Sequence, residues 1–217
     1  MAVPRPGSLQ NGSPSPDSFS FERHAHRRGI LRIAGCDEAG RGPLAGPVVA
    51  AAVVLPPDCD YTLFRDSKIL SPRVRETLAG HLAEIGARVG VGIVSAAEID
   101  TLNILRASLH AMRLAVEDLG PPLPDELLVD GKFAVPLPIA QQTLIKGETK
   151  SASIAAASIV AKVTRDRIMD ELHSRYPVYN FLRNKGYPTK EHRLALLHHG
   201  PCAEHRQTFR GVGEHGR

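Results

Sequence analysis

Two short apolar segments near the start of the chain, joined by a turn rich in glycine and proline, constrain the fold most strongly. Residues 30–36 and 47–55 are each of strand length, and the turn spans residues 40–47. The longest apolar run, residues 48–55, is far shorter than the roughly 20 residues of a membrane-spanning helix. The two segments are therefore predicted to be adjacent buried strands, and we expect no part of the chain to lie in a membrane.

The rest of the chain alternates between helix and strand patterns. Further strands are predicted at residues 88–94, 126–129 and 143–145, and helices at 71–87, 96–100, 104–119, 151–175 and 189–198. This order predicts an α/β fold in which a mixed β-sheet is flanked by helices and followed by a C-terminal helical portion. In such folds, ligands bind at the carboxyl ends of strands.

The length and the local composition predict one domain with an N-terminal tail. A chain of 217 residues builds one shielded core. Residues 1–29 are rich in proline, serine and glycine and end in a basic cluster, so we predict a disordered tail there and the folded domain at residues 30–217. The basic cluster is interpreted as a solvated linker rather than a phosphate contact.

The charge and the cysteine content indicate which binding partners and which cellular compartment suit the chain. The formal net charge of +4 is compatible with a polyanionic partner but does not require one. The three cysteines lie far apart and show no metal-ligand spacing, which favours a reducing compartment. No apolar core of a signal peptide is present near the N-terminus, so we expect a cytoplasmic protein.

Acidic residues are predicted at three strand ends. Asp37 and Glu38 follow the first strand, Asp130 ends another, and Glu148 lies just beyond a third. Each acid alone is better explained as a loop residue or a helix cap than as a metal ligand. Neighbouring strand ends lie about 5 Å apart, and hard divalent cations relieve the repulsion between clustered carboxylates. Together, the four acids predict a Mg²⁺ or Mn²⁺ site, without identifying a substrate.

Several sequence blocks resemble the ribonuclease HII family, in the family's order and spacing. They cover about residues 30–200 and comprise DEAGRGPLAGPV at 37–48, DSK at 66–68, LNIL at 102–105, VDG at 129–131, SIAAASIVAKVTRD at 153–166, and KGYPT at 185–189 followed by His192. The resemblance implies an RNase H-like fold and a metal-dependent endoribonuclease. Such an enzyme cleaves the RNA strand of RNA/DNA hybrids, and cleaves 5′ of single ribonucleotides embedded in duplex DNA.

The resemblance also implies site roles. Asp37, Glu38 and Asp130 correspond to metal ligands and catalytic carboxylates of a two-metal hydrolysis that leaves 3′-hydroxyl and 5′-phosphate ends. Glu148 occupies a position where the family normally has aspartate. Its side chain is one methylene longer, so it can still ligate a metal, but we expect reduced or Mn²⁺-shifted activity.

Substrate contacts are implied at the loop of Gly40, Arg41 and Gly42, at Lys68 and at Tyr187. The loop corresponds to the family's recognition loop for the ribose 2′-hydroxyl, and Tyr187 to a tyrosine that packs on a sugar. Considered separately, the glycines are explained by a tight turn, Arg41 and Lys68 by solvated charges, and Tyr187 by ordinary half-burial.

Other charged residues receive different interpretations. Lys146 and Lys185 are further candidate phosphate contacts, with solvated lysine as the alternative. Asp166 is interpreted as a structural ion-pair residue, and His198 and His199 match no metal spacing.

Three other functions are alternatives to a ribonuclease HII. A type-three ribonuclease H needs a larger N-terminal domain and a different residue at Arg41. A non-catalytic hybrid-binding protein would keep the motifs while Glu148 marked a decayed metal site, and turnover with added metal distinguishes the two. A structural protein has no need of a row of acids beside a Gly-Arg-Gly loop.

The resemblance further implies a monomer that removes ribonucleotides and RNA primers from DNA.

Overall fold

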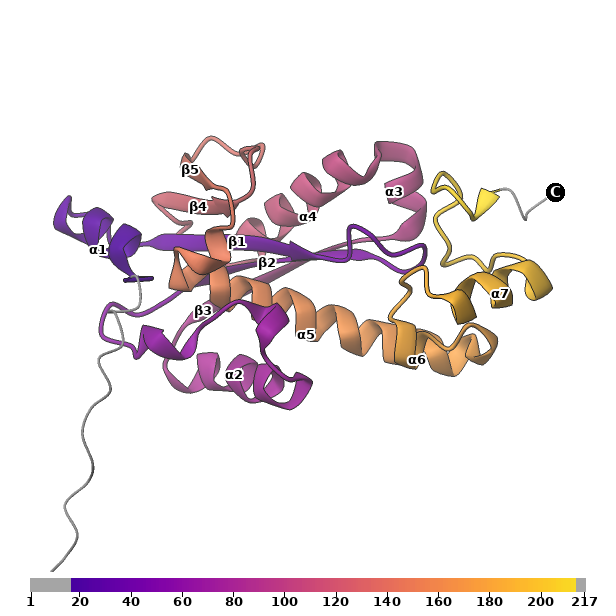
Figure 1. The fold of residues 1–217 in the computed structure, drawn as a ribbon. Coiled ribbons are helices and arrows are strands. Elements are labelled where there is room, and N and C mark those ends of the chain that lie inside the picture. The colour runs from indigo at the N-terminus through magenta and orange to yellow at the C-terminus, as the bar shows by residue number, and fades with distance from the viewer. Residues whose placement is uncertain (1–16, 214–217) are drawn as a thin grey trace, which may run out of the picture.

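The computed structural model describes residues 17–213 and contains a five-stranded mixed sheet (Figure 1). Its strands are β1 (Ile33–Ala39), β2 (Val48–Val54), β3 (Arg88–Val94), β4 (Glu126–Asp130) and β5 (Ala140–Leu144). They are ordered β3-β2-β1-β4-β5. β2 is antiparallel to both β1 and β3, whereas β4 is parallel to both β1 and β5. The predicted mixed sheet is confirmed.

Helices cover both faces of the sheet and extend beyond one end of it (Figure 1). They are α1 (Ser20–Arg27), α2 (Pro72–Glu84), α3 (Ala96–Leu102), α4 (Ile104–Asp118), α5 (Ala152–Arg175), α6 (Phe181–Asn184) and α7 (Lys190–His199). Short 3-10 turns are η1 (Tyr61–Leu63), η2 (Ser67–Ile69), η3 (Gly147–Thr149) and η4 (Pro177–Tyr179). In the described part of the chain, no helix is long and apolar enough to cross a bilayer.

The side chains of β2 alternate between two hydrophobic clusters. Val48, Ala50 and Ala52 belong to the cluster that includes α4, and Ala51 and Val53 to the cluster that includes α5. Because helices cover both faces, the strand is apolar throughout rather than alternating with polar residues. This explains why a continuous apolar run formed a strand.

Helix α5 lies unusually close to β1. A Cβ atom added to Gly35 would lie 2.1 Å from the carbonyl carbon of Ser153 and 2.2 Å from the backbone nitrogen of Ile154. The alanines at 155–157 are buried in the same interface. Small residues on both elements therefore set the distance between the helix and the sheet.

The predicted disordered tail is wrong for residues 17–29. Phe19, Glu22 and Ala25 are buried, and they recur every three residues along and just before α1. The Glu22 carboxylate accepts hydrogen bonds from the Ser151 hydroxyl (2.6 Å) and the Ser153 backbone N–H (3.0 Å) at the start of α5. The average polarity of the segment concealed this buried face. Residues 1–16 of the predicted tail lie outside the described residues.

The first strand also ends later than predicted. Asp37 and Glu38 lie within β1 and pair with Ala51 and Ala50 of β2, whereas we expected both acids after the strand. Pairing with β2 continues past the apolar residues because backbone hydrogen bonds do not depend on side-chain polarity. The acids remain at the carboxyl end of the strand.

The close contact between β1 and α5 predicts opposite effects of two glycine substitutions. Gly35→Ala places a methyl group against the backbone of α5, so we expect destabilisation on the order of 1–3 kcal/mol. Gly80→Ala, in α2, meets no atom within 4 Å and should stabilise by about 0.5–1 kcal/mol. Urea unfolding of both variants measures the effects. Equal stability of Gly35→Ala and the parent protein would contradict the described packing.

Candidate active site

A pocket of about 260 Å³ opens where β1 and β4 end. It contains three of the four predicted acids, together with the Gly40–Gly42 loop, Lys68 and Tyr187, where substrate contacts were implied. The lining residues are Asp37, Glu38, Ala39, Gly40, Arg41, Gly42, Ser67, Lys68, Asp130, Ser158, Lys162 and Tyr187. Segments that are far apart in the sequence thus meet at the predicted sheet edge.

The strand register brings Asp37 and Asp130 to the same level. Cys36 of β1 pairs with Val129 of β4, and each is followed directly by the aspartate. Asp37 is 6% exposed. Burial, with the charges of Glu38 and Asp130, raises the pKa of Asp37 well above its ordinary value. Burial also raises the pKa of Asp130. The carboxylates repel one another in the absence of a cation.

Two basic side chains hold the other two acids. Arg41 lies 3.2 Å from Glu38, and Lys68 lies 3.2 Å from Oε1 of Glu148. Burial raises the pKa of Glu148, but hydrogen bonds, including that from Lys68, lower it overall. Because Lys68 is largely exposed, solvent weakens its ion pair with Glu148, so another cation can replace Lys68 there.

Glu148 does not line the same pocket as the other acids. It lines a neighbouring hollow of about 420 Å³ together with Asp66 and Thr149. Its Oε2 atom is buried and has no hydrogen-bond partner. An orphaned carboxylate oxygen in a buried position is costly unless a cation or a donor approaches it.

The carboxylate oxygens of the four acids suit a hard divalent cation, although the acids are not arranged as a ready-made group of ligands. Within residues 17–213, no three acidic, histidine or cysteine side chains form a ready-made ligand group. Glu38 and Glu148 are instead turned to Arg41 and Lys68. The oxygen-only donors, the raised pKa values and the orphaned Glu148 oxygen all suit Mg²⁺ or Mn²⁺.

Three polar pocket residues received no site role from the sequence alone. Ser158 lines the pocket together with Asp37, and its hydroxyl lies 2.9 Å from that of Ser67. Lys162 lines the pocket one helical turn beyond Ser158. The i, i+4 spacing of Ser158 and Lys162 on one face of α5 was the signal that could have found them.

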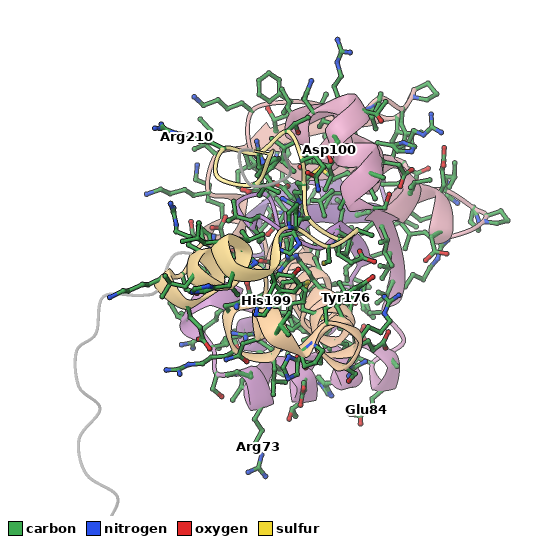
Figure 2. All side chains as sticks on the ribbon, turned by 90° about the vertical axis from the view of Figure 1, so that its right-hand side faces the viewer. Arg73, Glu84, Asp100, Tyr176, His199 and Arg210 are labelled. Atoms are coloured by element: carbon green, nitrogen blue, oxygen red, sulfur yellow. The ribbon has the colours of Figure 1, made fainter. Side chains whose placement is uncertain are left out.

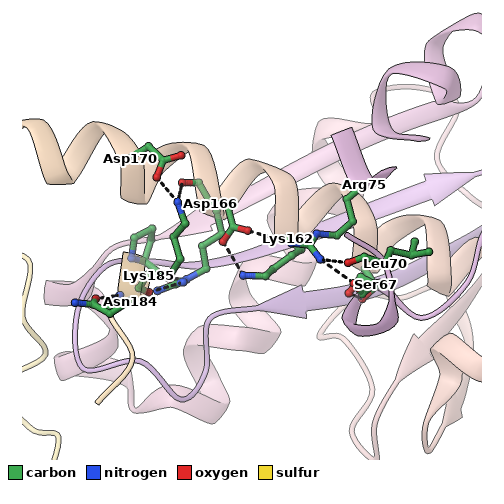
Figure 3. A network of polar contacts seen from close by, with 12 residues as sticks. Ser67, Leu70, Arg75, Lys162, Asp166, Asp170, Asn184 and Lys185 are labelled. Carbon is green, nitrogen blue, oxygen red and sulfur yellow. Dashed lines mark hydrogen bonds and ion pairs between the residues drawn. The ribbon is translucent and has the colours of Figure 1, made fainter. Parts of the chain in front are cut away.

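A network of charges continues from the pocket along α5 (Figure 3). Asp166 pairs with Lys162 at 2.6 Å and with Arg75 at 3.6 Å, consistent with the structural role expected for it. Arg75 in turn donates to the carbonyl oxygens of Ser67 (3.0 Å) and Leu70 (2.6 Å), beside Lys68.

The candidate phosphate contacts Lys185 and Lys146 lie outside the pocket lining. Lys185 pairs with Asp170 in the same network along α5 (Figure 3). Lys146 is exposed and precedes η3. A phosphate contact stays a prediction for both lysines.

Tyr187 is 43% exposed and is held from behind by a chain of two buried histidines. The Cys202 backbone N–H donates to Nδ1 of His205 (3.0 Å), so the proton of His205 lies on Nε2. That atom faces Nε2 of His192 at 3.0 Å, and His192 Nδ1 donates to the Tyr187 carbonyl oxygen at 2.9 Å. Both rings are neutral in this arrangement.

The histidine pair lies at the end of the molecule formed by α6, α7 and the C-terminal segment. Figure 2 views this end, with His199 and Tyr176 near the centre and Asp100 and Arg210 above them. Asp100, from α3, accepts hydrogen bonds from the backbone N–H groups of Gln207 (2.8 Å) and Thr208 (2.9 Å). These bonds fix the C-terminal segment to the rest of the fold.

The buried histidines predict a pH dependence of stability. Burial, with the charge of His192, lowers the pKa of His205 to about 4 from 6.5. Between these values the unfolded chain binds more protons, so stability rises with pH and is lost as pH falls. From pH 7 to pH 5, protonation of His205 in the unfolded chain should lower the free energy of unfolding by about 2 kcal/mol.

Urea unfolding at both pH values measures this loss. His205→Gln should reduce it, while His198→Gln, which changes an exposed imidazole of α7, serves as the matched control. Identical pH dependence in His205→Gln and the parent protein would contradict a buried neutral His205.

The chain is similar to known proteins over most of its length. The sequence profile of the family "Ribonuclease HII" matches residues 34–212. The chain is 60% identical to the ribonuclease HII of Desulfotalea psychrophila over 92% of this chain and 89% of that protein. It is 53% identical to the ribonuclease HII of Geobacter sulfurreducens over 96% and 95%.

A solved structure shows the same fold. The ribonuclease H2 of Pyrococcus horikoshii superposes with a TM-score of 0.73 at 26% sequence identity, covering 85% of this chain and 97% of that one. Because the family profile and these relatives span most of the chain, the chain belongs to the ribonuclease HII family of endoribonucleases.

Proposed function

We propose that this protein is a divalent-metal-dependent endoribonuclease that cleaves the RNA strand of RNA/DNA hybrids and cleaves 5′ of single ribonucleotides in duplex DNA. The observation that carries this proposal is the meeting of Asp37, Glu38 and Asp130 with the Gly40–Gly42 loop and Tyr187 in one pocket. Acids suited to metal binding and groups suited to ribose recognition therefore face the same small volume.

Asp37, Glu38 and Asp130 would hold the metal, and Glu148 would complete the set from the adjacent hollow. When bound there, Mg²⁺ or Mn²⁺ would supply water activation and charge stabilisation for a hydrolysis that leaves 3′-hydroxyl and 5′-phosphate ends. The protein's own contribution is to fix the carboxylates: the Glu38 N–H donates to Asp37 at 2.7 Å, and the Gly147 N–H donates to Asp130 at 2.7 Å.

Substrate binding would use the other side of the pocket. The exposed ring of Tyr187 offers a flat apolar surface for a sugar, and Lys68 and Lys162 supply positive charge for the phosphates. A ribose 2′-hydroxyl distinguishes RNA from DNA at the loop of residues 40–42.

The proposal extends to the setting of the enzyme. The family resemblance implies action as a monomer on RNA/DNA hybrids or on DNA that contains ribonucleotides. All three cysteines are free thiols, which supports a reducing compartment such as the cytoplasm. The task proposed there is removal of ribonucleotides and RNA primers from DNA.

The alternative function is that of a hybrid-binding protein without catalytic activity. A measurement of turnover distinguishes it from the proposed enzyme. It would explain the loop and Tyr187, but not a group of three carboxylates in which burial and mutual repulsion raise the pKa of Asp37.

Cleavage of a labelled DNA duplex with one ribonucleotide, in Mg²⁺ and in Mn²⁺, tests the proposal. Asp130→Asn should lower kcat at least about 100-fold because it removes a charged ligand without changing side-chain size. The matched control is Asp125→Asn, an acid that pairs with Arg32 away from the pocket. Tight hybrid binding with no cleavage in either metal would overturn the proposal.

Substitutions of Glu148 test the fourth acid. Glu148→Gln should raise the metal concentration for half-maximal activity roughly tenfold or more, since the amide lacks the ligating charge. Glu148→Asp retains the carboxylate and should stay within about tenfold of the parent kcat. Titration of Mg²⁺ and Mn²⁺ at saturating substrate measures both effects. Unchanged metal dependence in Glu148→Gln would exclude Glu148 as a ligand.

A further inference from the structure

Two fully buried arginines lie behind the Gly-Arg-Gly loop. Arg165, on α5, is 1% exposed, and Arg206, in the C-terminal segment, is 0% exposed. Neither forms an ion pair with a carboxylate in residues 17–213, whose salt bridges involve other cations. Burying two cations without acidic partners is costly, so strong compensating contacts must be present.

Those contacts are main-chain carbonyl oxygens, mostly of one loop. Arg206 donates to the carbonyls of Gly40 (2.6 Å), Arg41 (3.1 Å), Gly46 (2.9 and 3.0 Å) and Pro47 (3.2 Å). Arg165 donates to those of Ala45 (3.1 Å), Pro47 (3.0 Å) and Lys185 (3.0 Å). The two guanidinium groups therefore bind the loop of residues 40–47 from inside and also reach the segment that carries Tyr187.

The loop glycines are shaped by this contact. Gly40 has a φ of +98°, and a Cβ atom there would lie 2.1 Å from Nε of Arg165. Gly46 has a φ of +82°. Both backbone conformations favour glycine, and at Gly40 a side chain would also displace the arginine. The glycines and the arginines thus form one unit.

The inward carbonyls determine where the loop's N–H groups point. In a trans peptide, the carbonyl oxygen and the next residue's N–H project to opposite sides. Because the carbonyls of Gly40 and Arg41 face Arg206, the N–H groups of Arg41 and Gly42 face away from it. Both residues are exposed and line the pocket, and neither N–H donates within the described chain. A charged partner on the carbonyl also polarises the peptide, which strengthens its N–H as a donor.

We propose that Arg165 and Arg206 are positioning residues for ribose recognition, because they turn the Arg41 and Gly42 N–H groups toward the 2′-oxygen of the substrate. This inference rests on the proposed function and adds the residues that set its sugar specificity. The arginines act through the loop and do not touch the substrate.

Arg206→Lys tests the proposal because lysine keeps the charge but cannot bridge several carbonyls with a planar group. The readouts are kcat and KM on a DNA duplex with one ribonucleotide, and the ratio of its Kd to that of an all-DNA duplex of the same sequence. We expect KM for the ribonucleotide duplex to rise about tenfold, the scale of one lost specific hydrogen bond, with the all-DNA Kd unchanged.

Arg88→Lys is the matched control. Arg88 also clamps carbonyls, those of Leu119 (2.9 Å), Gly120 (2.8 Å) and Pro122 (2.9 Å), but none of these lies at the pocket. Its variant should keep the parent ratio. If folded Arg206→Lys also keeps the parent ratio and KM while the parent protein cleaves, the arginines are structural only and the proposal is overturned. Failure of the parent protein to cleave counts against the proposed function instead.

A measurement without any arginine substitution covers the case in which Arg206→Lys does not fold. In Asp130→Asn protein, the amide NMR signals of Arg41 and Gly42 should shift more with the ribonucleotide duplex than with the all-DNA duplex. Equal shifts with the two duplexes would overturn the proposal.

Discussion

Helix α5 lies against β1 because Gly35 has no side chain and the facing turn of the helix is rich in alanine. This contact fixes the position of one 24-residue helix against the central part of the sheet. Several contacts then follow from the rise of the helix. Its start receives Glu22 of α1 and adjoins the turn with Glu148. The next turns bring Ser158 and Lys162 to the pocket that contains Asp37, and Arg165 reaches the loop of residues 40–47.

The site combines opposing electrostatic demands. Acids are gathered and buried at the ends of β1 and β4, and burial together with repulsion from Glu38 and Asp130 raises the pKa of Asp37. Two buried cations behind the adjacent loop repel each other, and burial together with this repulsion lowers the pKa of Arg206 to about 9. Each group is costly to folding, and under the proposed function the acids would bind metal ions while the arginines would orient backbone donors. Stability elsewhere, in the two clusters that sandwich the sheet, offsets these costs.

The sequence predicts the sheet, the helices and the meeting of Asp37 with Asp130 because periodicity and strand ends are local signals. It does not predict α1, whose buried face consists of Phe19, Glu22 and Ala25 within a polar segment. It also gives no sign that Arg165 and Arg206 are buried, because their partners are carbonyls up to 166 positions away along the chain. Backbone acceptors carry no residue identity, so such contacts are visible only in the folded structure.

Manganese binding to the protein without nucleic acid tests the central claim that the acids at the ends of β1 and β4 form a metal site. The free Mn²⁺ signal in electron paramagnetic resonance measures the bound fraction as the ion is titrated. Asp37→Asn, which removes one charge at nearly constant shape, should weaken binding about tenfold or more, while Asp125→Asn should bind as the parent does. Equal binding by all three proteins would contradict the claim.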